Sequence, residues 1–307
     1  MIEVRNLTKY YGNFAAVNDV SFDAHSGEIV GLLGPNGAGK TSTMRMLTGF
    51  MPPSGGYAKV AGYDTFKESI EVRRRVGYLP ENVPVYPDMT VRDYVMFWAK
   101  LRRVAKPKQQ VDAALERVQL TDRRNTLVRN LSKGLKQRLG LAQALVHNPE
   151  VIILDEPTIG IDPQQVIEVR NTVKELGQDH TVLFSTHILA EAEQVCDRIL
   201  IINNGHIVAS GEPAALRQQI QPGVQLYILL GKHTPGKVQQ LFKAIEGVKH
   251  IEQQGDGYVL DVEPGHDVRA DIATQIVEAG YALLEMRPLA MTLEDIFLNI
   301  ISDKDYA

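Results

Sequence analysis

Over the first two thirds of the chain, segments whose hydrophobic residues have strand spacing alternate with segments whose hydrophobic residues have helical spacing. Apolar and polar residues alternate over residues 2–8 and again over residues 17–23, which predicts two strands that pair as an antiparallel edge. Residues 28–33 form a continuous apolar run that enters a glycine-rich turn, and residues 41–48 then have helical spacing. The order of these segments predicts a buried strand, a loop and a helix.

A predominantly helical segment follows. Aromatic and aliphatic side chains lie three and four residues apart at Tyr94, Phe97, Trp98 and Leu101 within residues 88–126. Ser132 can cap a further helix, which Pro149 ends before the apolar strand of residues 151–154. We therefore expect a helical insertion over about residues 88–148.

Strands and helices continue to alternate after this insertion. Helical patterns near residues 164–176 and 189–195 lie between candidate strands at residues 181–185, 199–202 and 206–209. Repeated strand and helix units predict an α/β fold with a mainly parallel sheet covered on both faces.

The pattern restarts near Gln221, Pro222 and Gly223, where we expect a boundary between domains 1–220 and 221–307. The second segment reads as strand 224–230, helix 235–245, strands 250–254 and 258–262, helix 267–279 and strand 283–287. This order predicts a small α+β domain of the split βαβ, ferredoxin-like type. A last helix would start at Thr292 and carry an apolar stripe to Ile301.

Composition supports a folded protein without a preference for nucleic acid. The 307 residues exceed a typical single domain, and 44% are hydrophobic and 23% charged. A formal charge of −4 gives no basic excess of the kind that binds nucleic acid. Cys196 is the only cysteine, so we expect a buried, inert thiol in a reducing compartment.

The chain shows no sign of a segment that enters a membrane. Its first residues lack the apolar core of a secretion signal, and no apolar run approaches the ~20 residues that cross a bilayer. We therefore expect a cytoplasmic protein, and any work at a membrane would need another chain.

A phosphate-binding loop is the strongest chemical signal. Residues 34–41 read GPNGAGKT, which fulfils GxxxxGK[ST] between a predicted strand and helix. Its glycines let backbone amides converge on phosphate oxygens, Lys40 reaches the β and γ phosphates, and Thr41 can ligate Mg²⁺. A glycine-rich turn with an exposed lysine is the alternative, and the strand–helix context argues against it.

Two further strand ends carry candidate chemistry. The run VIILDE places Asp155 and Glu156 at the end of an apolar strand, where α/β proteins bind ligands. Asp155 would hold Mg²⁺ through water, and Glu156 would orient or deprotonate the attacking water. His187 follows the next strand and could hydrogen-bond the γ-phosphate. Taken alone, the acids could cap a buried strand, and His187 could be an ordinary surface or core histidine.

This ordered set resembles the nucleotide-binding subunits of ABC transporters over about residues 2–215. The resemblance implies that Tyr11 stacks on adenine, with Tyr10 as its neighbouring rival, and that Val17 adjoins the nucleotide. It further implies nucleotide contacts from Gly34, Pro35, Asn36, Gly37, Ala38, Gly39, Lys40, Thr41 and Ser42.

The family's LSGGQ sequence, which closes over ATP bound by the opposite subunit, appears here as LSKGL. Ser132 and Gly134 match it and imply contacts with nucleotide across a dimer. Lys133 and Leu135 depart from it. Lys133 either adds charge to this contact or is simply solvated.

Two more positions follow from the resemblance. The family's glutamine between metal and membrane partner is replaced by Glu81, which can ligate Mg²⁺ but adds a negative charge near the phosphates. Asp162 matches the loop that passes between the two subunits, and it can also cap the helix that begins near Pro163.

The departures at YLPE and LSKG, with the extra C-terminal domain, look most like ATPase subunits of bacterial exporters whose membrane subunits are separate chains. The resemblance thus implies an ATP- and Mg²⁺-dependent ATPase, two copies facing head to tail, and attachment to the inner face of the cell membrane through a permease.

Two other functions are compatible with a phosphate-binding loop. A soluble relative could use the same ATPase on ribosomes or DNA, but those relatives carry two cassettes or a long coiled coil, and this chain has neither. A nucleotide-gated scaffold without turnover is disfavoured by the intact Asp155, Glu156 and His187.

Overall fold

The computed structural model describes residues 1–219, 224–231, 235–263 and 267–289. The chain divides into two compact units, Met1–Pro213 and Ala214–Ala307. The domain boundary expected at residues 220 and 221 and the helix expected from Thr292 lie outside the described residues.

The first unit is built on a six-stranded sheet. Its spatial order is β10-β9-β3-β8-β7-β6, and all neighbours from β9 to β6 are parallel. Only β10 pairs antiparallel, with β9. The strands are β3 (Ile29–Leu33), β6 (Val76–Leu79), β7 (Val151–Asp155), β8 (Thr181–Thr186), β9 (Arg198–Asn203) and β10 (His206–Gly211). The predicted mainly parallel sheet is confirmed.

A second, antiparallel sheet has the order β2-β1-β4-β5. It comprises β1 (Ile2–Tyr11), β2 (Phe14–Ala24), β4 (Gly55–Val60) and β5 (Tyr63–Asp64). The predicted antiparallel pair is confirmed, but both strands are longer than expected. The sequence pattern missed β4, β5 and the short helix α2 (Ser69–Arg75) that follows them.

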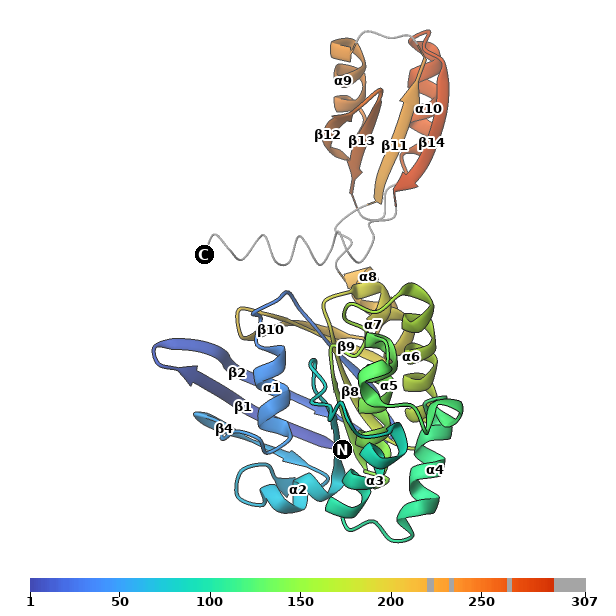
Figure 1. Ribbon diagram of the computed structural model, residues 1–307. Coiled ribbons are helices and arrows are strands. Elements are labelled where there is room, and N and C mark those ends of the chain that lie inside the picture. Colours follow the sequence, from blue (N-terminus) through green and yellow to red (C-terminus); the bar gives the residue numbers. More distant parts are fainter. Residues whose placement is uncertain (220–223, 232–234, 264–266, 290–307) are drawn as a thin grey trace. The chain divides into compact units, whose positions relative to one another are not determined.

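Helix α1 (Lys40–Leu47) lies between the two sheets, in contact with β2, β4 and β7 (Figure 1). The helices α6 (Pro163–Leu176) and α7 (Leu189–Val195) pack on each other, and α7 also packs on β3 and β8. A core of side chains such as Ile2, Leu32, Met44 and Ile153 therefore fixes α1, and with it the loop before it.

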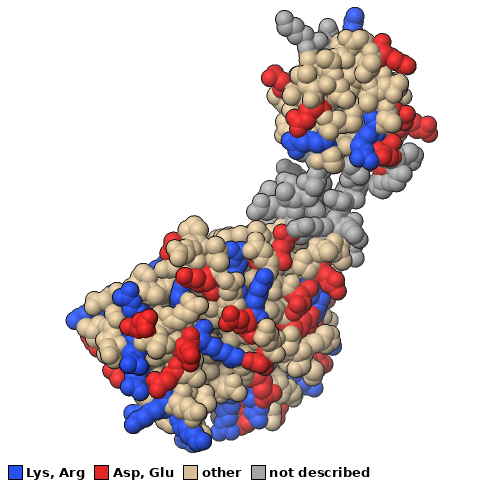
Figure 2. All heavy atoms as spheres, turned by 90° about the vertical axis from the view of Figure 1, so that its right-hand side faces the viewer, with Lys and Arg blue, Asp and Glu red and all other residues tan. Residues whose placement is uncertain are grey.

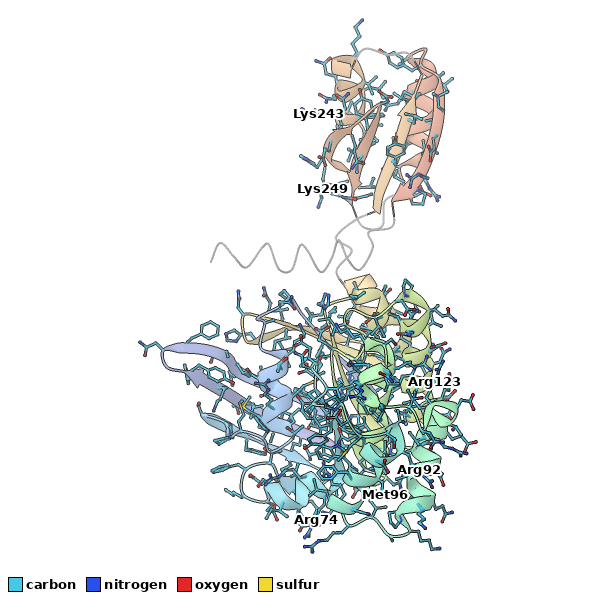
Figure 3. The ribbon with its side chains drawn as sticks, viewed as in Figure 1. Arg74, Arg92, Met96, Arg123, Lys243 and Lys249 are labelled. Carbon is cyan, nitrogen blue, oxygen red and sulfur yellow. The ribbon has the colours of Figure 1, made fainter. Side chains whose placement is uncertain are left out.

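The helical insertion contains α3 (Val91–Leu101), α4 (Pro107–Arg117), two short 3₁₀ turns (Thr121–Arg123 and Val128–Asn130) and α5 (Lys133–Leu145). Thr90 caps α3 by accepting a hydrogen bond from the amide of Asp93 at 3.1 Å. Arg92 of α3, labelled in Figure 3, pairs with Asp112 of α4 at 3.5 Å. Ser132 caps α5, as predicted, by accepting from the amide of Leu135 at 3.3 Å.

Helix α8 (Pro213–Gln219) begins at the last residue of the first unit and continues into the second, which contains a four-stranded antiparallel sheet of order β12-β13-β11-β14. The elements run β11 (Val224–Leu230), α9 (Pro235–Lys243), β12 (Val248–Gln254), β13 (Gly257–Val262), α10 (Arg269–Glu278) and β14 (Leu283–Leu289). Phe242, Tyr258 and Ile272 belong to its own buried core. The ferredoxin-like prediction is confirmed.

Acidic and basic side chains are interspersed on the face of the molecule that Figure 2 draws. Cys196 is buried, and burial raises the pKa of its thiol. Among the helices that the structure describes, none combines the length and the apolar character needed to cross a membrane.

Candidate functional site

The phosphate-binding loop joins β3 to α1, and close backbone approaches require glycine at two of its positions. Gly39 is the N-cap of α1 with φ 107°. A Cβ atom on Gly39 would lie 2.4 Å from the carbonyl oxygen of Ala16, and one on Gly34 would lie 2.3 Å from that of Ile202. No larger residue fits either position without moving backbone. The loop is therefore held against two strands, and the first amides of α1 lack acceptors within the helix.

Lys40 folds back over this loop. Its side chain is 6% exposed, and Nζ donates hydrogen bonds to the carbonyl oxygens of Gly34 at 2.7 Å and Pro35 at 3.1 Å. The same atom lies 3.2 Å from Oε1 of Glu156. A buried ammonium group thus faces the carboxyl group from the end of β7, across the mouth of the loop.

Asp155 ends β7 and is completely buried. Its Oδ1 accepts hydrogen bonds from the hydroxyl groups of Ser185 at 2.8 Å and Thr41 at 3.3 Å. Oδ2 has no hydrogen-bond partner among the described residues. Burial raises the pKa of Asp155, and the two hydroxyl donors oppose this effect while the charge of Glu156 adds to it.

Glu156 adopts a left-handed backbone conformation with φ 49°, which is unusual for a residue with a side chain. Its amide donates to Oγ of Ser185 at 2.9 Å, and the residue is 4% exposed. Its Oε2 lies 2.8 Å from Nδ1 of His187, which follows β8. The structure therefore brings together Lys40, Glu156 and His187, as the sequence predicted from three separate motifs.

A cavity of about 420 Å³ opens over this cluster. Its lining comprises Tyr11, Phe14, Ala16, Asn36, Gly37, Gly39, Lys40, Thr41, Ser42, Glu81, Glu156 and Ile159. Tyr11 is half-exposed at the cavity, with its hydroxyl 3.4 Å from Oγ of Ser42. The rival Tyr10 is not part of the lining, and Val17 is fully buried beneath Gly39.

The remaining predicted positions lie around the start of α5 and α6. Ser132, Gly134 and Asp162 do not line the cavity of their own chain. Asp162 caps α6 by accepting from the amide of Gln165 at 3.1 Å. Nζ of Lys133 lies against Gly160, so close that a Cβ there would be 2.3 Å away. The N-terminal turn of α5 and the loop before α6 therefore touch.

The groups around the cavity fit a phosphate chain and a hard cation. Lys40 holds two backbone carbonyl oxygens that phosphate oxygens could replace, and the adjoining helix start supplies free amides. Thr41 Oγ1 and the buried, unpartnered Oδ2 of Asp155 are oxygen ligands of the kind that Mg²⁺ takes. Glu81 adds a carboxyl group to the same lining.

Ser185 was not among the predicted site residues, although it contacts both acids. Its position is set by strand register, because Asp155 and Ser185 are directly paired between β7 and β8. A hydroxyl group at the end of the strand before His187 was the available signal. The sequence does not show that this hydroxyl group lies beside Asp155, because that depends on which strand pairs with β8.

Comparison with known proteins agrees with this geometry. A family model described as ABC transporter matches residues 17–159. The chain is 33% identical to the linearmycin resistance ATP-binding protein LnrL of Bacillus subtilis (strain 168), over 98% of each chain. It is 36% identical to the Nod factor export ATP-binding protein I of Burkholderia orbicola (strain AU 1054), over 86% of this chain and 87% of that one.

A solved dimeric structure of a bacterial ABC transporter cassette has the same fold. It superposes with a TM-score of 0.64 at 25% identity and covers 69% of this chain and 98% of that chain.

Proposed function

The chain belongs to the ABC transporter family, and on this premise we propose how its site works and what it drives. It is an ATP-binding and ATP-hydrolysing subunit of an ABC transporter. Relatives named for resistance and export systems support this reading over a soluble ATPase with a non-membrane partner and over a scaffold without turnover. The observation that carries the mechanism is the placement of Glu156 between Lys40 and His187.

The phosphates of ATP are bound by the loop from Gly34 to Ser42, with Lys40 exchanging its backbone carbonyl partners for phosphate oxygens. Tyr11 supports the adenine ring at the open side of the cavity. Mg²⁺, held by Thr41, Asp155 and Glu81, would neutralise phosphate charge. The remaining steps, which are to orient the attacking water and to balance the developing charge, are carried out by side chains of the protein.

Glu156 orients and deprotonates the attacking water. Its Oε2 accepts a hydrogen bond from Nδ1–H of His187. With the ring doubly protonated, Nε2–H on its other side would donate to an oxygen of the γ-phosphate. Lys40 lies beside Oε1 and would help to balance charge as it develops. Hydrolysis in this scheme depends on positioned charges rather than on a covalent intermediate.

We propose that two copies assemble head to tail, so that Ser132 and Gly134 of one copy contact ATP held by the other. The exposed Ser132 and the buried Gly134 lie outside the cavity of their own chain, and a related cassette has been solved as a dimer. Asp162, two residues after the Gly160 that Lys133 contacts, would lie at the junction. ATP would close this pair and product release would open it.

The mechanical output would be export by separate membrane subunits. The names of the relatives support export, and a partner docked near residues 81–95 would sense Glu81 at the cavity. The chain would then lie on the inner face of the cell membrane. We propose that residues 221–307 support dimerisation or regulation, and unchanged dimerisation, membrane assembly and ATPase rate after their deletion would remove both roles.

The central test is Glu156→Gln. The variant should bind ATP and accumulate as an ATP-bound dimer, seen by size-exclusion chromatography with labelled nucleotide, because the water lacks its base. Glu150→Gln is the matched control, since the Glu150 side chain is 63% exposed and pairs with Arg75 away from the cavity. Normal hydrolysis by Glu156→Gln would show that Glu156 has been assigned wrongly.

A further inference from the structure

Glu191 is a buried acid outside the predicted site. It lies in the first turn of α7 and is 4% exposed. Its Oε2 accepts hydrogen bonds from the hydroxyl groups of Thr158 at 2.7 Å and Thr186 at 3.0 Å. Thr158 and Thr186 are themselves buried. Among the described residues, no cationic side chain forms an ion pair with Glu191.

The two threonines belong to the two segments that carry the reacting side chains. Thr158 lies two residues after Glu156, and Thr186 directly precedes His187. Backbone pairing between β7 and β8 ends at Asp155 and Ser185. Beyond that pair, side chains must fix the two segments to each other, and Glu191 accepts a hydrogen bond from each segment.

The hydrogen-bond chemistry makes this bridge directional. Oγ1 of Thr186 accepts from the amide of Ile188 at 3.0 Å, so its single hydrogen is available to Glu191. A carboxyl oxygen has two acceptor positions, and the two hydroxyl groups fill them. The bridge therefore needs an acceptor oxygen at residue 191, which an apolar residue cannot provide.

The bridge also acts on a strained residue. Glu156 has φ 49°, and such conformations persist only where surrounding contacts determine them. The hydrogen bond from its backbone amide to Oγ of Ser185 fixes the backbone of Glu156, and the contact with His187 fixes its carboxyl group. Thr158 and Glu191 hold the chain that follows.

We infer that Glu191 is a positioning residue for hydrolysis, which keeps Glu156 and His187 in register by tying Thr158 to Thr186. This rests on the proposed function, in which Glu156 and His187 act on the attacking water. Small misplacements of catalytic groups are costly, so the loss of the bridge affects turnover more than nucleotide binding.

The test compares Glu191→Ala and Glu191→Gln in the full chain, with ATP turnover expressed per bound nucleotide. Glu191→Ala should lower kcat about 30-fold or more and leave KM for ATP within about threefold, since 1 Å of misplacement can cost ~100-fold. Glu191→Gln keeps an acceptor oxygen and should recover most of this loss. Glu175→Ala, which removes an exposed carboxyl group from the neighbouring helix α6, is the matched control.

A double-mutant cycle separates positioning from general damage. On a His187→Ala background, Glu191→Ala should lower kcat by a clearly smaller factor than in the native sequence, whereas a merely structural defect would lower kcat by the same factor in both backgrounds. Full multiplication of the two effects, or unchanged kcat in Glu191→Ala, overturns the inference. Glu156→Gln, measured in parallel, keeps the outcomes distinct: normal turnover in that variant contradicts the proposed function itself.

Discussion

Nδ1 of His187 lies 2.8 Å from Oε2 of Glu156, although 31 residues separate them in the chain. The imidazole is partly exposed, whereas the carboxyl group is almost completely buried. The contact therefore joins a solvent-accessible imidazole ring to a buried carboxyl group. His187 can therefore orient Glu156 and still present Nε2 to the nucleotide.

We predict that His187→Ala lowers kcat about 100-fold while ATP affinity changes less than about threefold, because the loop that binds phosphate stays intact. His187→Asn can place an amide N–H near the position of Nδ1 and should be several-fold more active than the alanine variant. The measurements are steady-state hydrolysis and binding of a fluorescent nucleotide. Equal rates for Ala and Asn would argue that the histidine does not act through Glu156.

The predictable part of this site is the part that is contiguous in sequence. GPNGAGKT and VIILDE each bring their residues together within one turn or one strand end, so linear pattern and local geometry coincide. Ser185 and Glu191 differ, because their contacts with the site depend on which strand lies beside β8 and on how α7 packs. No local pattern carries that information.

The same distinction explains the missed elements of the fold. Residues 55–64, which contain β4 and β5, include three glycines, alternating burial over few positions and no strong apolar run. Their strand character comes from pairing, of β4 with β1 and of β5 with β4. Helix α5 was recognised because its capping serine and apolar stripe are both local.

Asp155 should illustrate a conflict between stability and activity. It is fully buried, one of its oxygens has no partner in the described part of the chain, and burial raises its pKa. Asp155→Asn removes a buried charge and should raise the free energy of unfolding of the nucleotide-free protein at pH 7 by about 1 kcal/mol.

The same variant should lose Mg²⁺-dependent hydrolysis. Thermal unfolding in EDTA, and then with Mg²⁺ and ATP, separates the two effects: ligand should stabilise the native sequence more than the variant. Thr43→Ser on the buried side of α1 serves as a control for small changes near the loop. A variant that is less stable in EDTA would contradict the assignment of Asp155 as a destabilising charge.

The glycines of the phosphate-binding loop should differ in their tolerance of a methyl group. Gly39 has φ 107°, and its Cβ would meet the carbonyl oxygen of Ala16 at 2.4 Å. Gly37 has φ 84° with nothing within 4 Å of its Cβ. Gly37→Ala therefore adds conformational strain of about 1–2 kcal/mol, whereas Gly39→Ala also requires backbone movement and should cost about 3 kcal/mol or more. Chemical denaturation of both variants measures the difference, and equal losses would contradict the clash.

His147 should make stability depend on pH. Its Nε2 lies 3.1 Å from the carbonyl oxygen of Val76, and Nδ1 is buried without a partner among the described residues. Burial and then the positive charge of Arg102 lower the pKa of His147 to about 4. The folded chain thus keeps this imidazole neutral at pH values where the unfolded chain protonates it, near its ordinary value of about 6.5.

The sign of the effect follows from proton binding. Between about pH 6.5 and pH 4 the unfolded state binds a proton that the folded state does not, so the free energy of unfolding falls as pH is lowered. The loss from this one group should approach about 3 kcal/mol near pH 4. His147→Gln keeps an amide donor for Val76 but does not titrate, so denaturation at pH 7.5 and pH 5 should show a flatter dependence in the variant. His180, whose pKa is also lowered by burial, is present in both proteins and cancels from the comparison. Identical pH dependence in the two proteins would mean that His147 is protonated as readily in the folded chain as in the unfolded one.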